Sequence, residues 1–277
     1  MTQQHPLLEL NDGRSIPQLG LGVWRTPADA TAQAVKAALA TGYRHVDTAA
    51  IYGNEAGVGE GLGASGVARE EVYITTKLWN AEQGFDSTLR AFDASMKLLG
   101  LDVLDLYLIH WPRPAHGLYL DTWRAFVRLR EEGRVRSIGV SNFEPEHLDR
   151  IVQETGVKPV LNQIELHPRF QQHRLREYHA QHGIATQAWS PLGQGQLLED
   201  AGIQAIAAKY GKTAAQVVVR WHIEMGHVVI PKSVNPGRIA ENANVFDFKL
   251  DGQDMAAIAK LDQAGGRIGP NPLTADF

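Results

Sequence analysis

The chain has 277 residues, of which 44% are hydrophobic and 21% are charged, as in ordinary globular proteins. Its 27 basic and 31 acidic side chains give a net charge of −4, so its overall charge does not predict nucleic-acid binding. The absence of cysteine excludes disulfides, thiol catalysis and cysteine-ligated zinc.

The N-terminal segment, residues 1–13, lacks the apolar stretch of a signal peptide. No segment approaches the ~20 apolar residues that a membrane-spanning helix requires, so we expect a cytoplasmic protein. Asn11, Asp12 and Gly13 separate two short apolar segments and predict an N-terminal β-hairpin.

Short apolar segments alternate with amphipathic ones along the rest of the chain. Eight of them predict strands, at residues 19–23, 45–48, 72–77, 103–110, 135–142, 159–166, 185–192 and 228–233. Helical periodicity predicts helices between them, at residues 28–40, 87–99, 118–132, 145–154, 174–181 and 213–225. This alternation, without a linker, predicts an α/β fold: one (β/α)₈ TIM barrel over residues 1–277, preceded by the hairpin.

A doubly wound open sheet would show the same alternation. Polar residues at the strand ends favour the barrel, because barrel enzymes assemble their active sites from one or two residues per strand at that rim. These residues are Asp47, Lys77, His110, Ser141, Asn142, Gln163, Trp189, Lys232 and Ser233.

Asp47, Tyr52, Lys77 and His110 suit carbonyl reduction as a group. A tyrosine has a pKa of about 10, and a neighbouring lysine ammonium favours its phenolate, so we expect Lys77 to lower the pKa of Tyr52. A carboxylate keeps that ammonium charged, and a histidine can donate a hydrogen bond to a carbonyl oxygen. Taken singly, Asp47 could cap a loop, Tyr52 could be a packed aromatic and His110 a core histidine.

Other chemistries have less support. No His-x-His pair follows a strand, and neither a Gly-x-Ser-x-Gly elbow nor a P-loop is present. The glycine-rich residues 57–63 suggest a dinucleotide fingerprint, but they precede a strand and their spacing fits poorly, so we interpret them as helix and turn glycines. We expect no metal.

Residues 42–55, 101–112 and 230–242, with the shorter segments 139–143, 162–168 and 189–193, resemble the motifs of the aldo-keto reductase superfamily. The resemblance runs from Leu8 to about Leu261 and is greatest to the bacterial 2,5-diketo-D-gluconate reductases. It implies a metal-free, NADPH-dependent barrel that reduces aldehydes and ketones. In it Tyr52 is the proton donor, Asp47 and Lys77 tune it, and His110 orients the carbonyl group.

The resemblance also implies a cofactor site. Ser141, Asn142 and Gln163 would bind the nicotinamide carboxamide, and Trp189 would stack under the ring. The remaining expected cofactor-binding residues comprise the segment near the pyrophosphate, the 2′-phosphate pocket and the adenine side: Ser190, Leu192, Gln194, Gly195, Lys232, Ser233, Val234, Arg238, Glu241 and Asn242. A solvated charge cluster is the alternative interpretation of the Lys232–Arg238 region.

Trp24, Trp79 and Trp111 follow strand ends and are expected to form the substrate pocket with His110. Residues 112–118 form a short loop and the last residues are expected to be a surface segment, which predicts an open mouth for small polar carbonyl compounds. We expect a monomeric reductase of 2,5-diketo-D-gluconate or of small carbonyls such as methylglyoxal. The alternatives are a non-catalytic NADP(H)-sensing barrel and, with less support, a metal-dependent hydrolase on the same fold.

Overall fold

The computed structural model describes residues 5–277. Residues 1–4 lie outside the described residues. They are part of the expected single domain and of the N-terminal segment that was expected to lack a signal peptide. Strands β1 (Leu7–Glu9) and β2 (Ser15–Pro17) pair antiparallel across Asn11–Gly13, so the predicted hairpin is confirmed. Within residues 5–277, no helix combines the length and the apolar composition needed to span a membrane.

Eight parallel strands form the central sheet, in the order β10-β9-β8-β7-β6-β5-β4-β3. They are β3 (Leu21–Gly22), β4 (His45–Asp47), β5 (Tyr73–Leu78), β6 (Leu104–Ile109), β7 (Val135–Ser141), β8 (Leu161–Glu165), β9 (Ala185–Trp189) and β10 (Val228–Val229). Parallel bridges join Leu19 to Val229 and Gly22 to Lys232. The first and last strands therefore meet, which closes the sheet into a barrel and excludes the open-sheet alternative.

Two predicted strands end three or four residues earlier than expected. The strand predicted over 185–192 stops at Trp189, because Ser190 has a φ of 49° and turns the backbone out of the extended conformation. The strand predicted over 228–233 is regular only at Val228–Val229, since Pro231 has no N–H to donate to a neighbouring strand.

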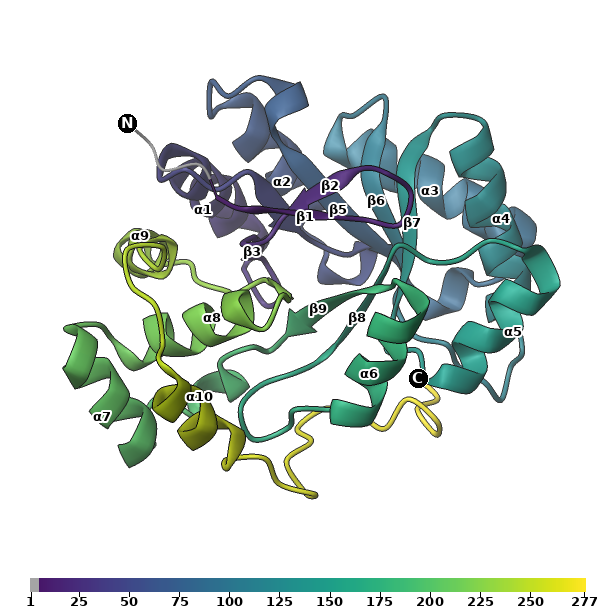
Figure 1. Cartoon of the computed structure of the whole chain (residues 1–277). Helices are drawn as coiled ribbons and strands as arrows, with labels where there is room; N and C mark the ends of the chain where they lie inside the picture. Colours follow the sequence, from purple (N-terminus) through teal and green to yellow (C-terminus); the bar gives the residue numbers. More distant parts are fainter. Residues whose placement is uncertain (1–4) are drawn as a thin grey trace.

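Ten helices are found within residues 5–277: α1 (Ala28–Ala40), α2 (Glu55–Gly63), α3 (Phe85–Leu99), α4 (Tyr119–Glu131), α5 (Pro145–Thr155), α6 (His173–His182), α7 (Ala201–Tyr210), α8 (Ala214–Glu224), α9 (Pro236–Ala243) and α10 (Gly252–Ala259). All six predicted helices are present. Helices α2, α7, α9 and α10 were not placed as separate elements by the sequence periodicity. Figure 1 shows α3, α4 and α5 along the outer side of β5, β6 and β7.

The glycines of α2 allow close helix packing. A Cβ atom at Gly57 would lie 2.9 Å from Thr31 Cβ in α1, and one at Gly61 would lie 2.7 Å from Val35 Cβ. A Cβ atom at Gly59 would collide with the carbonyl oxygen of Leu99 at the end of α3. These glycines are therefore packing residues of a helix, as the sequence analysis interpreted them.

The hairpin covers the end of the barrel at which the strands begin. Leu10 and Ile16 of the hairpin are buried in one apolar cluster with Leu106, Leu161 and Val228 from the strands. Figure 1 shows the hairpin and the C-terminal segment, in purple and yellow, on opposite sides of the molecule. Since the hairpin fills one end, the polar residues at the carboxyl ends of the strands line the other.

Candidate active site

A buried ion pair lies at the carboxyl ends of β4 and β5. Lys77 Nζ is 2.5 Å from Asp47 Oδ1 and donates a second hydrogen bond to the Thr48 carbonyl oxygen at 2.9 Å. Lys77 is fully buried and Asp47 is 2% exposed. Gln163 Nε2, from β8 across the barrel, donates to Asp47 Oδ2 at 2.7 Å. Both carboxylate oxygens and the ammonium thus have partners, as a buried ion pair requires.

Tyr52 and His110 lie over this ion pair. Tyr52 ends the short 3₁₀ helix η1 (Ala50–Tyr52), and Lys77 Nζ lies 5.2 Å from the centre of its ring. The Tyr52 and His110 rings are 5.8 Å apart in an edge-to-face arrangement. The structure therefore brings together all four residues that the sequence selected from separate segments.

The pKa of Tyr52 differs from the sequence expectation. Burial raises the pKa of the Tyr52 phenol above its usual 10.0, and this effect exceeds the lowering by the Lys77 ammonium. The expectation that Lys77 brings this pKa below its ordinary value is wrong in net direction, although the influence of Lys77 has the expected sign. In the protein without bound ligand the phenol is thus protonated at neutral pH.

The protonation states of Lys77 and His110 follow from the same buried environment. Burial alone would lower the pKa of Lys77, but the charges and hydrogen bonds of Asp47 and Tyr52 raise it above its usual value. Burial, reinforced by the Lys77 ammonium, lowers the pKa of His110 well below 6.5, so its imidazole is neutral at physiological pH. His110 Nδ1 is buried and has no hydrogen-bond partner among residues 5–277.

The expected nicotinamide-binding residues form a connected network beside the ion pair. Trp189 Nε1 donates to Asn142 Oδ1 at 2.8 Å, and Asn142 Nδ2 donates to the His110 carbonyl oxygen at 3.0 Å. Ser141 Oγ donates to the Gln163 carbonyl oxygen at 2.8 Å. Asn142 has a φ of 62°, a strained conformation that this network holds in place. Trp189 is thus fixed at the rim with its ring partly exposed.

Two cations lie where the 2′-phosphate was expected. Lys232 and Arg238 are exposed, and the structure gives neither an ion-pair partner within residues 5–277. Between them Asn235 caps α9, with its Oδ1 accepting from the Arg238 backbone N–H at 3.1 Å. Cations and a helix N-terminus are the groups that hold phosphate, so these residues fit the group that the resemblance implies.

The other expected cofactor residues are more dispersed. Gly195 and the exposed Gln194 belong to the short 3₁₀ helix η4 (Gly193–Gly195). Ser190 and Leu192 lie just before this helix in the chain. Val234 is exposed and Asn242 is buried. Glu241 Oε1 accepts a hydrogen bond from Thr213 Oγ1 at 2.8 Å, so part of its carboxylate binds the N-cap of α8.

The expected substrate walls are joined by a residue that the sequence analysis did not select. The C-terminal Phe277 stacks on Trp79 at 6.0 Å between ring centres and lies edge-on to Trp111 at 5.3 Å. Trp79 also lies 5.3 Å from the His110 ring, whereas Trp24 is 39% exposed. The expectation of an open mouth is therefore corrected, because the C-terminal residue covers part of two of the aromatic walls.

Gln187 is a second residue that the sequence analysis missed. It is fully buried in β9, and its Oε1 accepts from Gln163 Nε2 at 2.9 Å, which extends the Asp47–Gln163 network. A glutamine in the middle of a strand that, apart from Thr186, is otherwise apolar was a usable signal. Phe277 gave none, since nothing in the sequence shows where a terminal residue lies. No cluster of three or more potential metal ligands occurs within residues 5–277.

A closed (β/α)₈ barrel with this tetrad at its rim defines a class of carbonyl-reducing enzyme. Residues 17–263 match the profile described as the aldo/keto reductase family. The chain belongs to this family and is an oxidoreductase, which confirms the family and the enzyme class expected from the sequence.

Individual relatives match over nearly the whole chain. An aldo-keto reductase of Mycolicibacterium smegmatis is 60% identical over 272 residues, covering 98% of each chain. Methylglyoxal reductase DkgA of Yersinia pestis is 53% identical over 274 residues, again covering 98% of each. The crystal structure of apo Gox0644 has a TM-score of 0.96 at 57% identity, covering 99% of this chain and 100% of that one. A mutant of Gox0644 in complex with NADPH matches equally well, and these structures confirm the fold class.

Proposed function

We propose that this protein uses NADPH to reduce the carbonyl groups of small aldehydes and ketones, with methylglyoxal as a representative substrate. The observation that carries the proposal is the buried Asp47–Lys77 pair beneath Tyr52, with neutral His110 on the same rim. A protonated phenol beside a buried ammonium is suited to giving a proton to a carbonyl oxygen.

The chain's own residues handle the proton and orient the carbonyl group. Bound NADPH would supply the hydride that the carbonyl carbon accepts. Tyr52 donates its phenolic proton to the carbonyl oxygen, and the Lys77 ammonium stabilises the phenolate left behind. Asp47 and Gln163 hold Lys77 charged and in place.

The unpartnered Nδ1 of His110 indicates its tautomer. A buried N–H without an acceptor is less tolerable than an unpaired acceptor, so the proton belongs on Nε2. His110 Nε2 can then donate to the carbonyl oxygen alongside Tyr52. Cofactor affinity comes from Lys232 and Arg238 at the 2′-phosphate and from Ser141, Asn142, Gln163 and Trp189 at the nicotinamide.

The substrate proposal has support from relatives. A protein 53% identical over almost the whole chain is named methylglyoxal reductase DkgA. The carbonyl panel for this protein therefore includes methylglyoxal, 2,5-diketo-D-gluconate and simple aldehydes. The monomeric state, the single domain and the cytoplasmic location stay predictions.

The test is a Tyr52→Phe variant assayed with NADPH and this panel. We expect turnover to disappear while NADPH still quenches tryptophan emission. The matched control is Tyr178→Phe on α6, whose hydroxyl binds Asp149 on α5, and this variant should retain turnover. If Tyr52→Phe retains turnover, Tyr52 is not the proton donor. Binding of NADPH by the wild type without turnover of any carbonyl compound would favour the sensing barrel.

A further inference from the structure

Tyr52 lies on a loop, residues 48–55, that joins β4 to the first turn of α2. The outer side of this loop is exposed, since the side chain of Ile51, next to Tyr52, is 48% exposed. On the other side of Tyr52, Gly53 has a φ of 65°, which lets the chain turn into α2. Packing holds only the inner side of the loop, so its position depends strongly on how its two ends are fixed.

Asn54 ties the two ends of the loop together. It is 1% exposed at the N-cap of α2, where an asparagine side chain usually accepts a hydrogen bond from the helix backbone, but it makes no such cap. Its Oδ1 instead accepts from Thr48 Oγ1 at 2.7 Å, and its Nδ2 donates to the carbonyl oxygens of Val23 and Thr26 at 3.0 and 3.3 Å. Because the Thr48 carbonyl oxygen accepts from Lys77 Nζ, Asn54 also links the loop to the buried ammonium.

Glu55 binds the loop to the strand that carries Lys77. It is the first residue of α2 and is 2% exposed. Its Oε1 accepts from Thr76 Oγ1 at 2.5 Å, and its Oε2 accepts from Ser95 Oγ of α3 at 3.1 Å. Thr76 precedes Lys77 in β5, and successive side chains of a strand point to opposite faces. Glu55 therefore holds β5 from outside the barrel, at the residue next to Lys77.

We propose that Glu55 is a positioning residue that, together with Asn54, holds the loop so that the Tyr52 hydroxyl stays within reach of Lys77 and of the substrate carbonyl group. This inference rests on the proposed carbonyl reduction. Both side chains act through the backbone of the loop, because their polar atoms bind neighbouring elements rather than the reacting groups. Proton transfer needs hydrogen-bond geometry, and a displacement of the reacting group by about 1 Å can lower the rate about 100-fold.

The first test compares Glu55→Ala with Glu55→Gln. Alanine removes both hydrogen bonds, so the single-turnover rate of carbonyl reduction should fall about 10–100-fold, while the KM for the carbonyl compound and the Kd for NADPH change less than about threefold. Glutamine keeps the shape and can accept from one hydroxyl and donate to the other, so its rate should stay within about threefold of wild type. An unchanged rate in Glu55→Ala would overturn the proposal. A loss in Glu55→Gln as large as that in Glu55→Ala would also overturn it, because the charge and not the position would then matter.

The two hydroxyl partners of Glu55 provide a matched pair of variants. Thr76→Val removes the hydroxyl from the strand that carries Lys77, and the single-turnover rate should fall at least about fivefold. Ser95→Ala removes the hydroxyl on α3, and it should lower the midpoint of thermal unfolding with the rate within about twofold of wild type. Equal losses of rate would indicate a general packing effect and contradict the proposal. If Glu55→Ala does not fold, this comparison decides.

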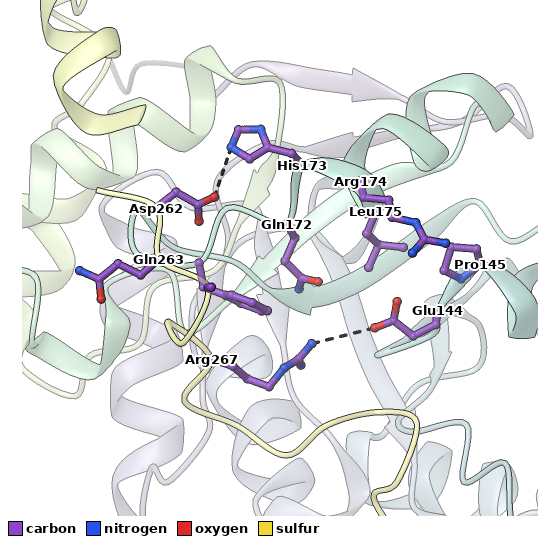
Figure 2. A pocket seen from close by; sticks show the side chains of 11 residues that line it. Glu144, Pro145, Gln172, His173, Arg174, Leu175, Asp262, Gln263 and Arg267 are labelled. Atoms are coloured by element: carbon purple, nitrogen blue, oxygen red, sulfur yellow. Dashed lines mark ion pairs between the residues drawn. The ribbon is translucent and has the colours of Figure 1, made fainter. Parts of the chain in front are cut away.

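Glu144 provides a control elsewhere on the rim. It lies at the start of α5 in an open pocket of about 350 Å³ between α5, α6 and residues 262–267. Figure 2 shows Arg267 reaching toward it, with 4.0 Å between Arg267 Nη2 and Glu144 Oε1. Such a long, partly exposed ion pair contributes little, so Glu144→Ala should leave the single-turnover rate unchanged. A loss as large as that in Glu55→Ala would mean that the effect is not specific to the Tyr52 loop, and the proposal would fail.

Hydrogen exchange separates the anchoring from the proposed function. Exchange at residues 48–55 should rise about tenfold in Glu55→Ala and in Asn54→Ala, and it should stay at the wild-type rate in Glu55→Gln. Wild-type exchange in either alanine variant would show that the replaced residue does not anchor the loop. If the wild type reduces no carbonyl compound, the proposed function fails, and hydrogen exchange alone decides whether Asn54 and Glu55 fix the position of Tyr52.

Discussion

Lys77 Nζ lies 2.5 Å from Asp47 Oδ1, and neither side chain exposes more than 2% of its surface. Each group therefore depends on the other for its charged state, since removing one partner leaves the other buried and unpaired. The pair links the stability of the barrel rim to the proton transfer that we propose for Tyr52.

The Lys77→Met variant tests this link. Turnover should fall by about 10²–10⁴-fold, because the phenolate of Tyr52 loses its stabilising charge. Stability should fall by about 3–5 kcal/mol, because Asp47 remains buried without a counter-charge. Steady-state kinetics and urea unfolding measure the two effects. Adding Asp47→Asn should restore much of the stability but none of the turnover, and recovered turnover would argue against a role for the ammonium.

The pH dependence of reduction follows from the two pKa shifts. Tyr52 donates a proton, so it must be protonated, and burial raises its pKa above the usual 10.0. The rate should therefore fall only as the pH rises through that raised pKa. His110 has a pKa well below 6.5 and stays neutral, so no loss of rate is expected near pH 6.5. A kcat/KM profile from about pH 5.5 to about pH 10.5 tests both statements. An inflection near 6.5 would show that His110 titrates.

We expect cofactor choice to depend on Lys232 and Arg238. Replacing either with alanine should weaken NADPH binding by about 10–100-fold, because a charge-assisted contact to the 2′-phosphate is lost. NADH lacks that phosphate, and its affinity should change much less. Fluorescence titration with both nucleotides measures the difference. Lys97→Ala, which removes an exposed cation from α3, is the control and should alter neither affinity. An equal loss of affinity for NADPH and NADH would show that the 2′-phosphate binds elsewhere.

The glycines of α2 offer a test of packing. Gly59→Ala should destabilise the protein by about 1–3 kcal/mol, because the new methyl group meets the backbone oxygen of Leu99. Gly63 lies in the same helix, and a Cβ atom there would meet nothing within 4 Å. Gly63→Ala should therefore leave stability unchanged or slightly increase it. Thermal unfolding compares the two, and NADPH affinity should be unaffected in both. A specific loss of NADPH binding in Gly59→Ala would reopen the dinucleotide-fingerprint interpretation.

The barrel could be predicted from sequence because its signals are local. Nearly every apolar strand segment ends in a polar residue, and Asp47, Lys77 and His110 fall at the ends of three consecutive strands. Parallel pairing brings such ends to one rim. Helices α7 and α10 escaped detection because they lie outside the simple alternation and their short, alanine-rich sequences carry little periodicity.

The site was less predictable where it depends on distant parts of the chain. The net pKa of Tyr52 is set by burial, and burial is a property of the folded surroundings. A contact between Glu165 and residues 268–269 joins positions about a hundred residues apart through backbone amides, which carry no sequence signature. Phe277 likewise joins the expected substrate wall through contacts with distant residues, the rings of Trp79 and Trp111.

Leu10 and Ile16 of the hairpin close the end of the barrel at which the strands begin, so that only the opposite end is open to ligands. The proposed dinucleotide, carbonyl compound and alcohol product would therefore all share the rim at the carboxyl ends of the strands.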